Sequence, residues 1–412
     1  MTDNVTQRYI TMDALRGFAV MGILLINIMP FGMPDLAFIS PAIYGDVDAA
    51  NVGTWITTFV LVDGKMRGLF TLLFGASMML VIERAEANGQ SPAAVHYSRI
   101  FWLALFGLAH FFFIWWGDIL FLYAGAGAVI YFMRNWEART LIKWGVIIYA
   151  IGSLLLMIGM TTMLTIEIQA SAANAGPEAL ARYQRVIDDI GLSDAATMQQ
   201  VALYLGSYGD ILTDRINQRG FLPLQNLILA PFETIPIMMI GMGLYKNRFL
   251  LGERDRAVYW RWGLWLTGIG LALMLMLVGI AFAKDFQVIW MFNMTQAWAA
   301  PSRLLMTLGY IALLILLIQS INGSAILERV AAAGRAAFTN YLGTSIICTT
   351  IFYGYGFALF GELSRPMLYL VVLGVWALML LWSKPWLDRF RYGPLEWLWR
   401  SLARRELQPL RK

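Results

Sequence analysis

The sequence predicts an all-α protein, a polytopic transmembrane helical bundle that forms a single membrane domain over residues 1–412. Apolar residues make up 59% of the chain and charged residues only 14%, whereas a soluble domain carries roughly 25% charged residues. Long apolar runs recur along the sequence, and each is near the roughly 20 residues that cross a bilayer. Most of the surface is therefore expected to face lipid.

About ten of these runs are long enough to be spans. They cover residues 14–31, 66–84, 100–116, 119–133, 141–166, 222–245, 262–282, 303–321, 336–357 and 366–383. The stretch 50–62 is also apolar, but it is too short to cross a bilayer alone. We expect it to form a short interfacial or re-entrant helix, which is tolerated where protein covers it.

Basic residues orient the bundle. Of the 31 lysines and arginines, 22 fall in the termini and in the loops on their side, and nine fall on the other side. Because basic residues collect on the cytoplasmic side, both termini are expected to be cytoplasmic in a bacterial inner membrane. Residues 167–221 then form a periplasmic amphipathic loop, with one or two helices lying over the bundle. Residues 385–412 form a basic, amphipathic cytoplasmic tail.

Several functional classes have no support in the sequence. No basic module interleaved with aromatic residues lies outside the apolar runs, so no nucleic-acid partner is expected. The chain has one cysteine, Cys348, and two histidines, so neither an internal disulfide nor a cysteine–histidine metal site is expected. No phosphate loop or nucleophile elbow occurs. His96 lies in a predicted cytoplasmic loop and is expected to be solvated.

His110 is the sharpest candidate for chemistry, because a polar side chain inside a span is costly. It lies eight residues before Asp118, which we expect at the outer surface, so it is about 12 Å deep. A neutral imidazole there could act as a general base, or it could be a structural histidine bonded between helices. Its neighbours at helical spacing offer no polar partner, so Asn27, Asn340 or Glu233 is expected to supply one.

Charged residues near the outer ends of spans form a second group of candidates. Lys65 and Arg67 break the positive-inside pattern, and either an anionic substrate group or Asp63 could compensate them. The alternative is that they snorkel to lipid headgroups. Asp118 follows a glycine and opens the next helix, so it can cap that helix or orient a charged group in an outer cavity.

Other polar residues lie within spans or at their ends. Asp13 and Arg16 are three residues apart at the inner entrance of the first span, so an ion pair is expected on one helix face. Asn27 lies eleven residues further, close to the same face. Glu233 stands between two prolines, a setting that often lines a cavity. Asn340 belongs to a polar stripe that could bind substrate or only support helix packing.

At these residues the chain resembles the YeiB-like family, also called domain of unknown function 418. The matching stretches are spread over the whole chain. They are Met12-Asp13-Ala14-Leu15-Arg16-Gly17-Phe18 with Ile26-Asn27, Lys65-Met66-Arg67-Gly68-Leu69-Phe70 with Leu73-Phe74-Gly75, His110 with Gly117-Asp118-Ile119-Leu120, Thr339-Asn340-Tyr341, and Arg391-Tyr392-Gly393-Pro394-Leu395-Glu396.

That family is similar to a wider superfamily of transmembrane acyltransferases, which includes heparan glucosaminide N-acetyltransferase and enzymes that decorate bacterial surface sugars. The resemblance implies transfer of an acyl group from cytoplasmic acyl-CoA to an acceptor reached from the periplasmic side. The sugar-decorating relatives carry a histidine in the first span, where this chain has Asn27. Their catalytic histidine cannot be carried over, so His110 is chosen from the residues alone.

The leading hypothesis is therefore a membrane acyltransferase without a metal. His110 would take the proton from the acceptor, Asn27 or Asn340 would polarise the acyl carbonyl, and Arg16 would meet the phosphates of acyl-CoA. The expected partners are the lipid bilayer, acyl-CoA, an unknown acceptor and a possible second copy of the chain. The alternative is a transporter or exporter of a small or lipid-like solute, which would use the same buried polar groups as its binding site. A non-catalytic scaffold is a third hypothesis.

Overall fold

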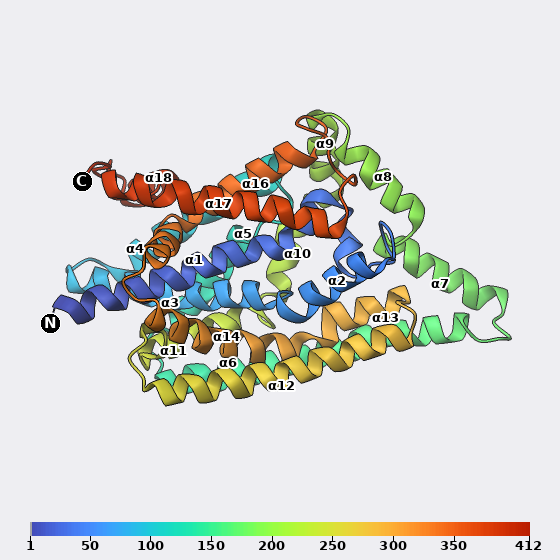
Figure 1. The fold of residues 1–412 in the computed structure, drawn as a ribbon, viewed down its shortest axis with the longest axis horizontal. Coiled ribbons are helices and arrows are strands. Elements are labelled where there is room, and N and C mark those ends of the chain that lie inside the picture. The colour runs from blue at the N-terminus through green and yellow to red at the C-terminus, as the bar shows by residue number, and fades with distance from the viewer. Residues whose placement is uncertain (1) are drawn as a thin grey trace.

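A computed structural model describes residues 2–412, and helices dominate it (Figure 1). The helices are α1 Thr2–Gly32, α2 Ala49–Leu61, α3 Lys65–Ala87, α4 Pro92–Phe113, α5 Leu120–Ile130, α6 Ala138–Ala170, α7 Pro177–Ile190, α8 Asp194–Tyr204, α9 Tyr208–Arg219, α10 Leu222–Leu229, α11 Thr234–Lys246, α12 Arg256–Ala283, α13 Val288–Asn293, α14 Ala300–Ser320, α15 Ala325–Arg335, α16 Ala337–Phe352, α17 Arg365–Arg389 and α18 Pro394–Arg404. Within residues 2–412 no strand forms, which confirms the all-α prediction.

Six helical segments are long and apolar enough to cross a membrane, which indicates a membrane protein. They are Ile10–Gly32, Ala49–Ala87, Ala138–Ala170, Arg256–Ala283, Ala300–Ser320 and Arg365–Arg389. Helices α10 and α11 would make a seventh span if taken together. The two helices are bent by 57° at the break between Leu229 and Thr234, which contains Glu233. The predicted count of about ten spans is therefore not confirmed.

Two of the predicted spans are shorter than expected. The run 119–133 forms α5 and one 3₁₀ turn, Leu120–Met133, which covers only about 21 Å at the helical rise. Helix α16 ends at Phe352 after 16 residues, or about 24 Å. The stretch 50–62 forms α2, which joins α3 in one apolar segment of 39 residues interrupted at Gly64. Gly64 has φ +73°, a left-handed conformation that favours glycine.

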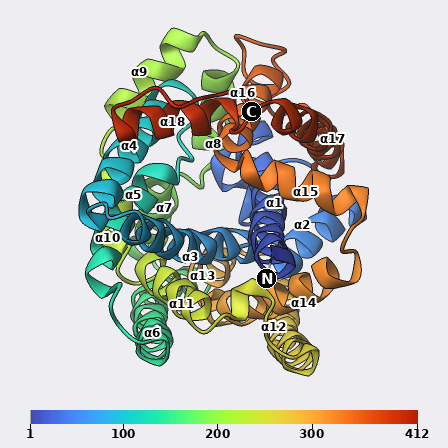
Figure 2. The same ribbon diagram turned by 90° about the vertical axis from the view of Figure 1, so that its left-hand side faces the viewer.

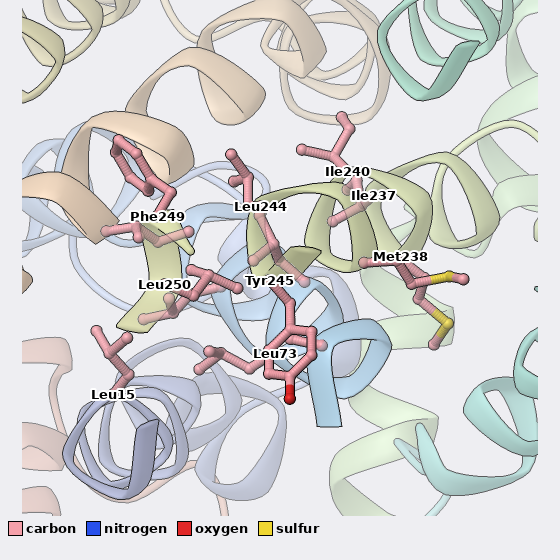
Figure 3. Close-up of a cluster of buried hydrophobic side chains, with 14 of the residues drawn as sticks. Leu15, Leu73, Ile237, Met238, Ile240, Leu244, Tyr245, Phe249 and Leu250 are labelled. Atoms are coloured by element: carbon pink, nitrogen blue, oxygen red, sulfur yellow. The ribbon is translucent and has the colours of Figure 1, made fainter. Parts of the chain in front are cut away.

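Both termini lie at one end of the molecule, and α7 and α8 lie at the opposite end (Figure 1). Helices α1, α3 and α11 run through the interior, where the largest cluster of buried apolar side chains includes Leu15, Leu73, Met238 and Leu250 (Figure 3). Helices α6 and α12 stand at the periphery (Figure 2), and only 28% of the most apolar window of each is buried. Their outer faces suit contact with lipid.

Three helices, α7, α8 and α9, follow the long α6 in the loop 167–221, where one or two were expected. Helix α9 is fastened to the bundle by two arginines. Arg215 is only 3% exposed. Its Nη1 donates to the carbonyl oxygens of Phe111 and Phe112, at 3.3 and 2.9 Å. These are orphan acceptors at the C-terminal end of α4, so α9 closes that end of α4. Arg219 pairs with Asp35, just after α1.

Burial raises the pKa of the Asp35 carboxyl, while the neighbouring Arg219 guanidinium acts to lower it. Gln200 of α8 adds two hydrogen bonds, accepting from the Asp35 backbone N–H at 2.7 Å and donating to its carboxylate at 2.8 Å. The loop therefore docks through a buried polar network as well as through apolar contacts.

Candidate functional site

His110 and Asp118 form a buried pair inside the bundle. The Nδ1 atom of His110 lies 2.9 Å from Oδ1 of Asp118, and the two side chains are 0% and 2% exposed. The other carboxylate oxygen, Oδ2, accepts from the backbone N–H of Phe121 at 2.8 Å, in the first turn of α5. Asp118 thus accepts a hydrogen bond in the first turn of α5, as expected of a cap, and contacts His110 at the same time; its expected role toward a charged group in an outer cavity stays a prediction.

The expected partner of His110 was wrong. Asn27, Asn340 and Glu233 were expected to bond to it, but Asp118 does so because the chain folds back after α4. A Cβ added at Gly107 would lie 2.4 Å from the backbone nitrogen of Phe121. The start of α5 therefore packs against α4 six residues before α4 ends, about 9 Å from that end, and the depth of His110 in a bilayer stays a prediction.

The imidazole is left with one free nitrogen. Nε2 of His110 is buried and has no hydrogen-bond partner among the described residues. If Nδ1 carries the proton that Asp118 accepts, Nε2 presents an unshared electron pair. Two aromatic rings pack nearby, with ring centroids 5.3 Å away for Tyr341 and 6.4 Å away for Trp115. The indole N–H of Trp115 is also buried without a partner, so donor and acceptor capacity remain unused here.

A small cavity adjoins this pair. Its lining includes Asn27 and Phe31 of α1 and Tyr341 of α16. Tyr341 contacts the His110 ring and Phe31 stacks on Trp115 with centroids 4.0 Å apart, so the cavity and the histidine are separated by one layer of rings. The Asn27 amide makes no hydrogen bond to any other residue of the described chain. Asn27 therefore shares the cavity lining with Tyr341, whose ring contacts His110, and its polar group is free.

The charges at the start of α3 are compensated differently from the prediction. Asp63 forms its ion pair with Arg303 of α14 and not with Lys65 or Arg67, although its charge also acts on both of them. Lys65 is fully buried and donates to the carbonyl oxygen of Phe59 at 2.8 Å, near the C-terminal end of α2. Arg67 pairs with Glu233 at the break between α10 and α11. Arg303 was missed, since it opens an ordinary apolar run.

The Arg67–Glu233 pair is the more open of these two ion pairs. Its side chains are 45% and 42% exposed, against 11% for each partner in the Asp63–Arg303 pair. Glu233 lies where the two helices bend by 57°, as its setting between prolines suggested. The prediction that it lines a cavity stays a prediction.

Asp13 and Arg16 form the predicted ion pair at 2.7 Å. Arg16 also donates from Nε and Nη2 to the hydroxyl of Ser77 on α3, at 3.2 and 3.0 Å.

The side chain of Asn340 uses all of its hydrogen-bonding groups in helix packing. Its amide donates to the carbonyl of Ala333 and to Ser383 Oγ, and its oxygen accepts from Trp382 Nε1. Asn340 thus joins α15, α16 and α17 and has no free donor for a substrate.

Two polar residues behave differently from their sequence context. His96 is 3% exposed, not solvated, because α4 begins at Pro92 and carries it into the bundle. Its Nε2 lies 3.0 Å from the carbonyl oxygen of Gly127.

Glu396 accepts hydrogen bonds from the backbone N–H groups of Phe338 and Thr339 and from the Thr339 hydroxyl. Burial raises the pKa of Glu396, and these hydrogen bonds oppose that rise. Glu396 therefore caps α16 from α18.

Among residues 2–412, no group of three or more histidine, cysteine, aspartate or glutamate side chains is arranged to hold a metal ion. The single cysteine, Cys348, is buried as expected from its apolar run.

Comparison with known proteins agrees with the resemblance seen in the motifs. The chain is 30% identical over 416 residues to the uncharacterized protein YeiB of Escherichia coli (strain K12), covering 98% of both chains. The chain belongs to the YeiB-like family. Residues 244–406 match the profile of that family, described as "Protein of unknown function (DUF418)". The family also includes the uncharacterized protein YxaH of Bacillus subtilis (strain 168), 30% identical over 98% of this chain and 96% of the relative.

A third relative is an uncharacterized 39.9 kDa protein from the amylase 3′ region of Bacillus acidopullulyticus, 24% identical over 96% of this chain and 94% of its own. The similarity thus extends over nearly the whole length of each of these proteins. No solved structure matches the chain significantly.

Proposed function

We propose that this chain is an integral membrane acyltransferase that moves an acyl group from acyl-CoA to an acceptor reached from the opposite side of the membrane. One observation carries the proposal. The buried His110–Asp118 pair is 2.9 Å apart and leaves Nε2 without a partner, which is the arrangement of an oriented general base. The resemblance to membrane acyltransferases supports the same reaction class.

In this mechanism Nδ1–H of His110 donates a hydrogen bond to Asp118, which fixes the tautomer so that Nε2 can accept a proton. The acceptor hydroxyl or amine transfers its proton to Nε2 as its oxygen or nitrogen attacks the acyl carbonyl. A tetrahedral oxyanion forms and collapses, the carbon–sulfur bond breaks, and the CoA thiolate takes up a proton from the imidazolium. The Asn27 amide could donate to the oxyanion from the adjoining cavity.

Access to His110 needs a rearrangement. Its side chain is 0% exposed, so no acceptor can reach Nε2 while Tyr341 and Trp115 keep their present positions. Movement of aromatic side chains of this kind commonly gates buried active sites. The reaction would then exclude water, which limits hydrolysis of the acyl donor.

The orientation follows from charge. With 22 of 31 basic residues on the side of the termini, we propose that both termini are cytoplasmic in a bacterial inner membrane. The helices α7 to α9 would then be periplasmic, and the basic amphipathic α18 would lie at the inner leaflet. The short α2 would stay on the outer side without crossing alone, since 13 residues cover only about 20 Å. About ten crossings remain our proposal for the full topology.

The test uses purified protein in liposomes, isotope-labelled acetyl-CoA and a cell-envelope extract as the acceptor pool. Label transfer should fall by 10²–10⁴-fold in His110→Gln, which keeps a polar group but removes the base. His96→Gln is the matched control, because that histidine contacts only structural groups. Full transfer by His110→Gln would reject the general-base role, and no transfer by the wild type with short or long acyl-CoA would reject the reaction.

A transporter of a small or lipid-like solute is the second candidate, and the bend between α10 and α11 favours it. Broken helices with charged groups at the break are typical of transport sites, and Arg67 meets Glu233 there. A disulfide between Gly125→Cys and Leu227→Cys would fix α10 to α5, since a Cβ at Gly125 lies 2.3 Å from the Leu227 side chain. Transport requires α10 to move and should stop on oxidation, whereas acyl transfer at His110 should continue.

A further inference from the structure

Four arginines from four helices gather at the end of the molecule that bears both termini. We propose that Arg16, Arg99, Arg335 and Arg400 form a binding site for the phosphate groups of an anionic ligand. Figure 2 looks at this end, where α18 lies over α4 on one side and α15 lies beside α1 on the other. This phosphate site goes beyond the acyl transfer at His110 and stands on separate residues.

The first half of the site is built around Asp13. Arg16 bonds to this carboxylate at 2.7 Å and to Ser77 of α3 through its other two nitrogens. Arg335 comes to the same place because the preceding Gly334 packs directly on α1. A Cβ at Gly334 would lie 1.8 Å from the carbonyl oxygen of Asp13. This close approach holds α15 against α1, and Arg335 therefore acts electrostatically on Asp13.

The second half is built on aromatic rings. Trp399 of α18 donates from its indole to the backbone carbonyl of Arg99 at 2.9 Å, and the Arg99 guanidinium lies 4.1 Å from the Trp399 ring centroid. Arg400 lies 4.6 Å from the ring centroid of Tyr392. A guanidinium stacked on a ring keeps its N–H edge open for bidentate bonding to phosphate. These two arginines are thus held in place without using up their donors.

Among the described side chains, these arginines outnumber the carboxylates that act on them. Arg99, Arg335 and Arg400 form no ion pair with a carboxylate in the part of the chain that the structure describes. Among the described side chains, the carboxylates that act on these arginines are Asp13 and Glu396, and Glu396 accepts the hydrogen bonds that cap α16. Arg16 and Arg400 also repel the Arg99 guanidinium. Partly buried like charges destabilise one another, so an anion with several oxygens would relieve this repulsion.

Two sources could supply such an anion, a soluble nucleotide-type ligand or an anionic lipid headgroup. Along α4, Arg99 and His110 are eleven residues apart, or about 16 Å. An extended covalent chain advances about 1.2 Å per bond, so the long arm of acyl-CoA could connect the arginines with His110. The assignment of acyl-CoA as the ligand rests on the proposed function, whereas the binding of phosphate groups by the arginines does not.

The experiment measures binding to the purified full chain in neutral detergent. Adenosine 3′,5′-bisphosphate and CoA are titrated by calorimetry, and phosphatidylglycerol is compared with phosphatidylcholine by native mass spectrometry. Arg99→Gln and Arg335→Gln should each weaken phosphate binding by roughly ten-fold or more. Arg99→Lys should retain part of it because the charge remains. Arg411→Gln removes an exposed arginine outside the cluster, near the same end of the chain, and should bind like the wild type.

Each outcome decides the inference. Arginine-dependent binding of the bisphosphate or CoA supports a soluble ligand, and arginine-dependent binding of phosphatidylglycerol alone supports a headgroup. Absence of binding by all three probes overturns the site, as does equal binding by the wild type and the two glutamine variants. Phosphate binding should persist in His110→Gln. If it persists while no acyl transfer is found in the wild type, the site stands and the proposed function fails.

Discussion

Gly107→Ala tests whether the close packing of α4 on the start of α5 holds the His110–Asp118 pair. The added Cβ would lie 2.4 Å from the backbone nitrogen of Phe121 and 2.9 Å from Oδ2 of Asp118. Ordinary carbon contacts are near 3.5 Å, so the start of α5 must move by about 1 Å. A flexible side chain could yield, but the nearest atom belongs to the backbone.

The magnitude has three parts. Overpacking of a filled interior costs about 1–3 kcal/mol. Weakening of the buried hydrogen bond between His110 and Asp118 costs about 1–3 kcal/mol more. Replacing glycine by alanine within a helix returns about 1 kcal/mol. The free energy of unfolding should therefore fall by about 1–5 kcal/mol, and the proposed acyl transfer should fall with it because the base loses its orientation.

The assay is denaturant unfolding of the purified protein in detergent, followed by circular dichroism. Gly159→Ala is the matched control, since Gly159 is also helical and a Cβ there meets no atom within 4 Å. That variant should be as stable as the wild type or more stable, by up to about 1 kcal/mol. An unchanged unfolding midpoint for Gly107→Ala would refute the packing argument, because it would mean that α5 has room to move.

Three other predictions concern separate parts of the molecule. Arg67→Gln and Glu233→Gln should each lower the free energy of unfolding by no more than about 1–2 kcal/mol, because the pair is nearly half exposed. A double-mutant cycle measures the coupling energy of the two side chains, and a value near zero would show that the pair does not contribute to stability. Glu396→Gln should loosen α18 and lower stability by about 1–3 kcal/mol, seen as faster proteolysis after residue 390; unchanged proteolysis would contradict its capping role. In a chain without its native cysteine, a cysteine at Ala173 should be labelled by an impermeant thiol reagent on spheroplasts, and a cysteine at Leu407 should not. Labelling of position 407 alone would reverse the proposed topology.

Some features of this protein follow from the sequence because they are local. Hydropathy is a sum over neighbouring residues, so the apolar runs predict membrane helices without any knowledge of how those helices pack. The Asp13–Arg16 pair was predictable for the same reason, since residues three apart share a helix face. Asp118 as a cap of the following helix was likewise visible in the chain order.

The partners of the buried charges could not be read from the sequence. Asp63 meets Arg303 across 240 positions and Arg67 meets Glu233 across 166, and no periodicity connects such residues. Asn340 has the composition of a binding residue, yet the packing of α15 and α17 consumes its hydrogen bonds. Whether a polar group is free or engaged depends on its neighbours in space.

By itself, then, the sequence determined an all-helical membrane protein and the family to which it belongs. Only the tertiary structure decided that His110 faces Asp118, because that contact depends on the chain folding back and on α5 starting beside Gly107. It also decided which arginines converge near the termini, since the packing of α15 and α18 brings them together. Hydropathy acts along the chain, whereas hydrogen bonds and charges act across the space that packing creates.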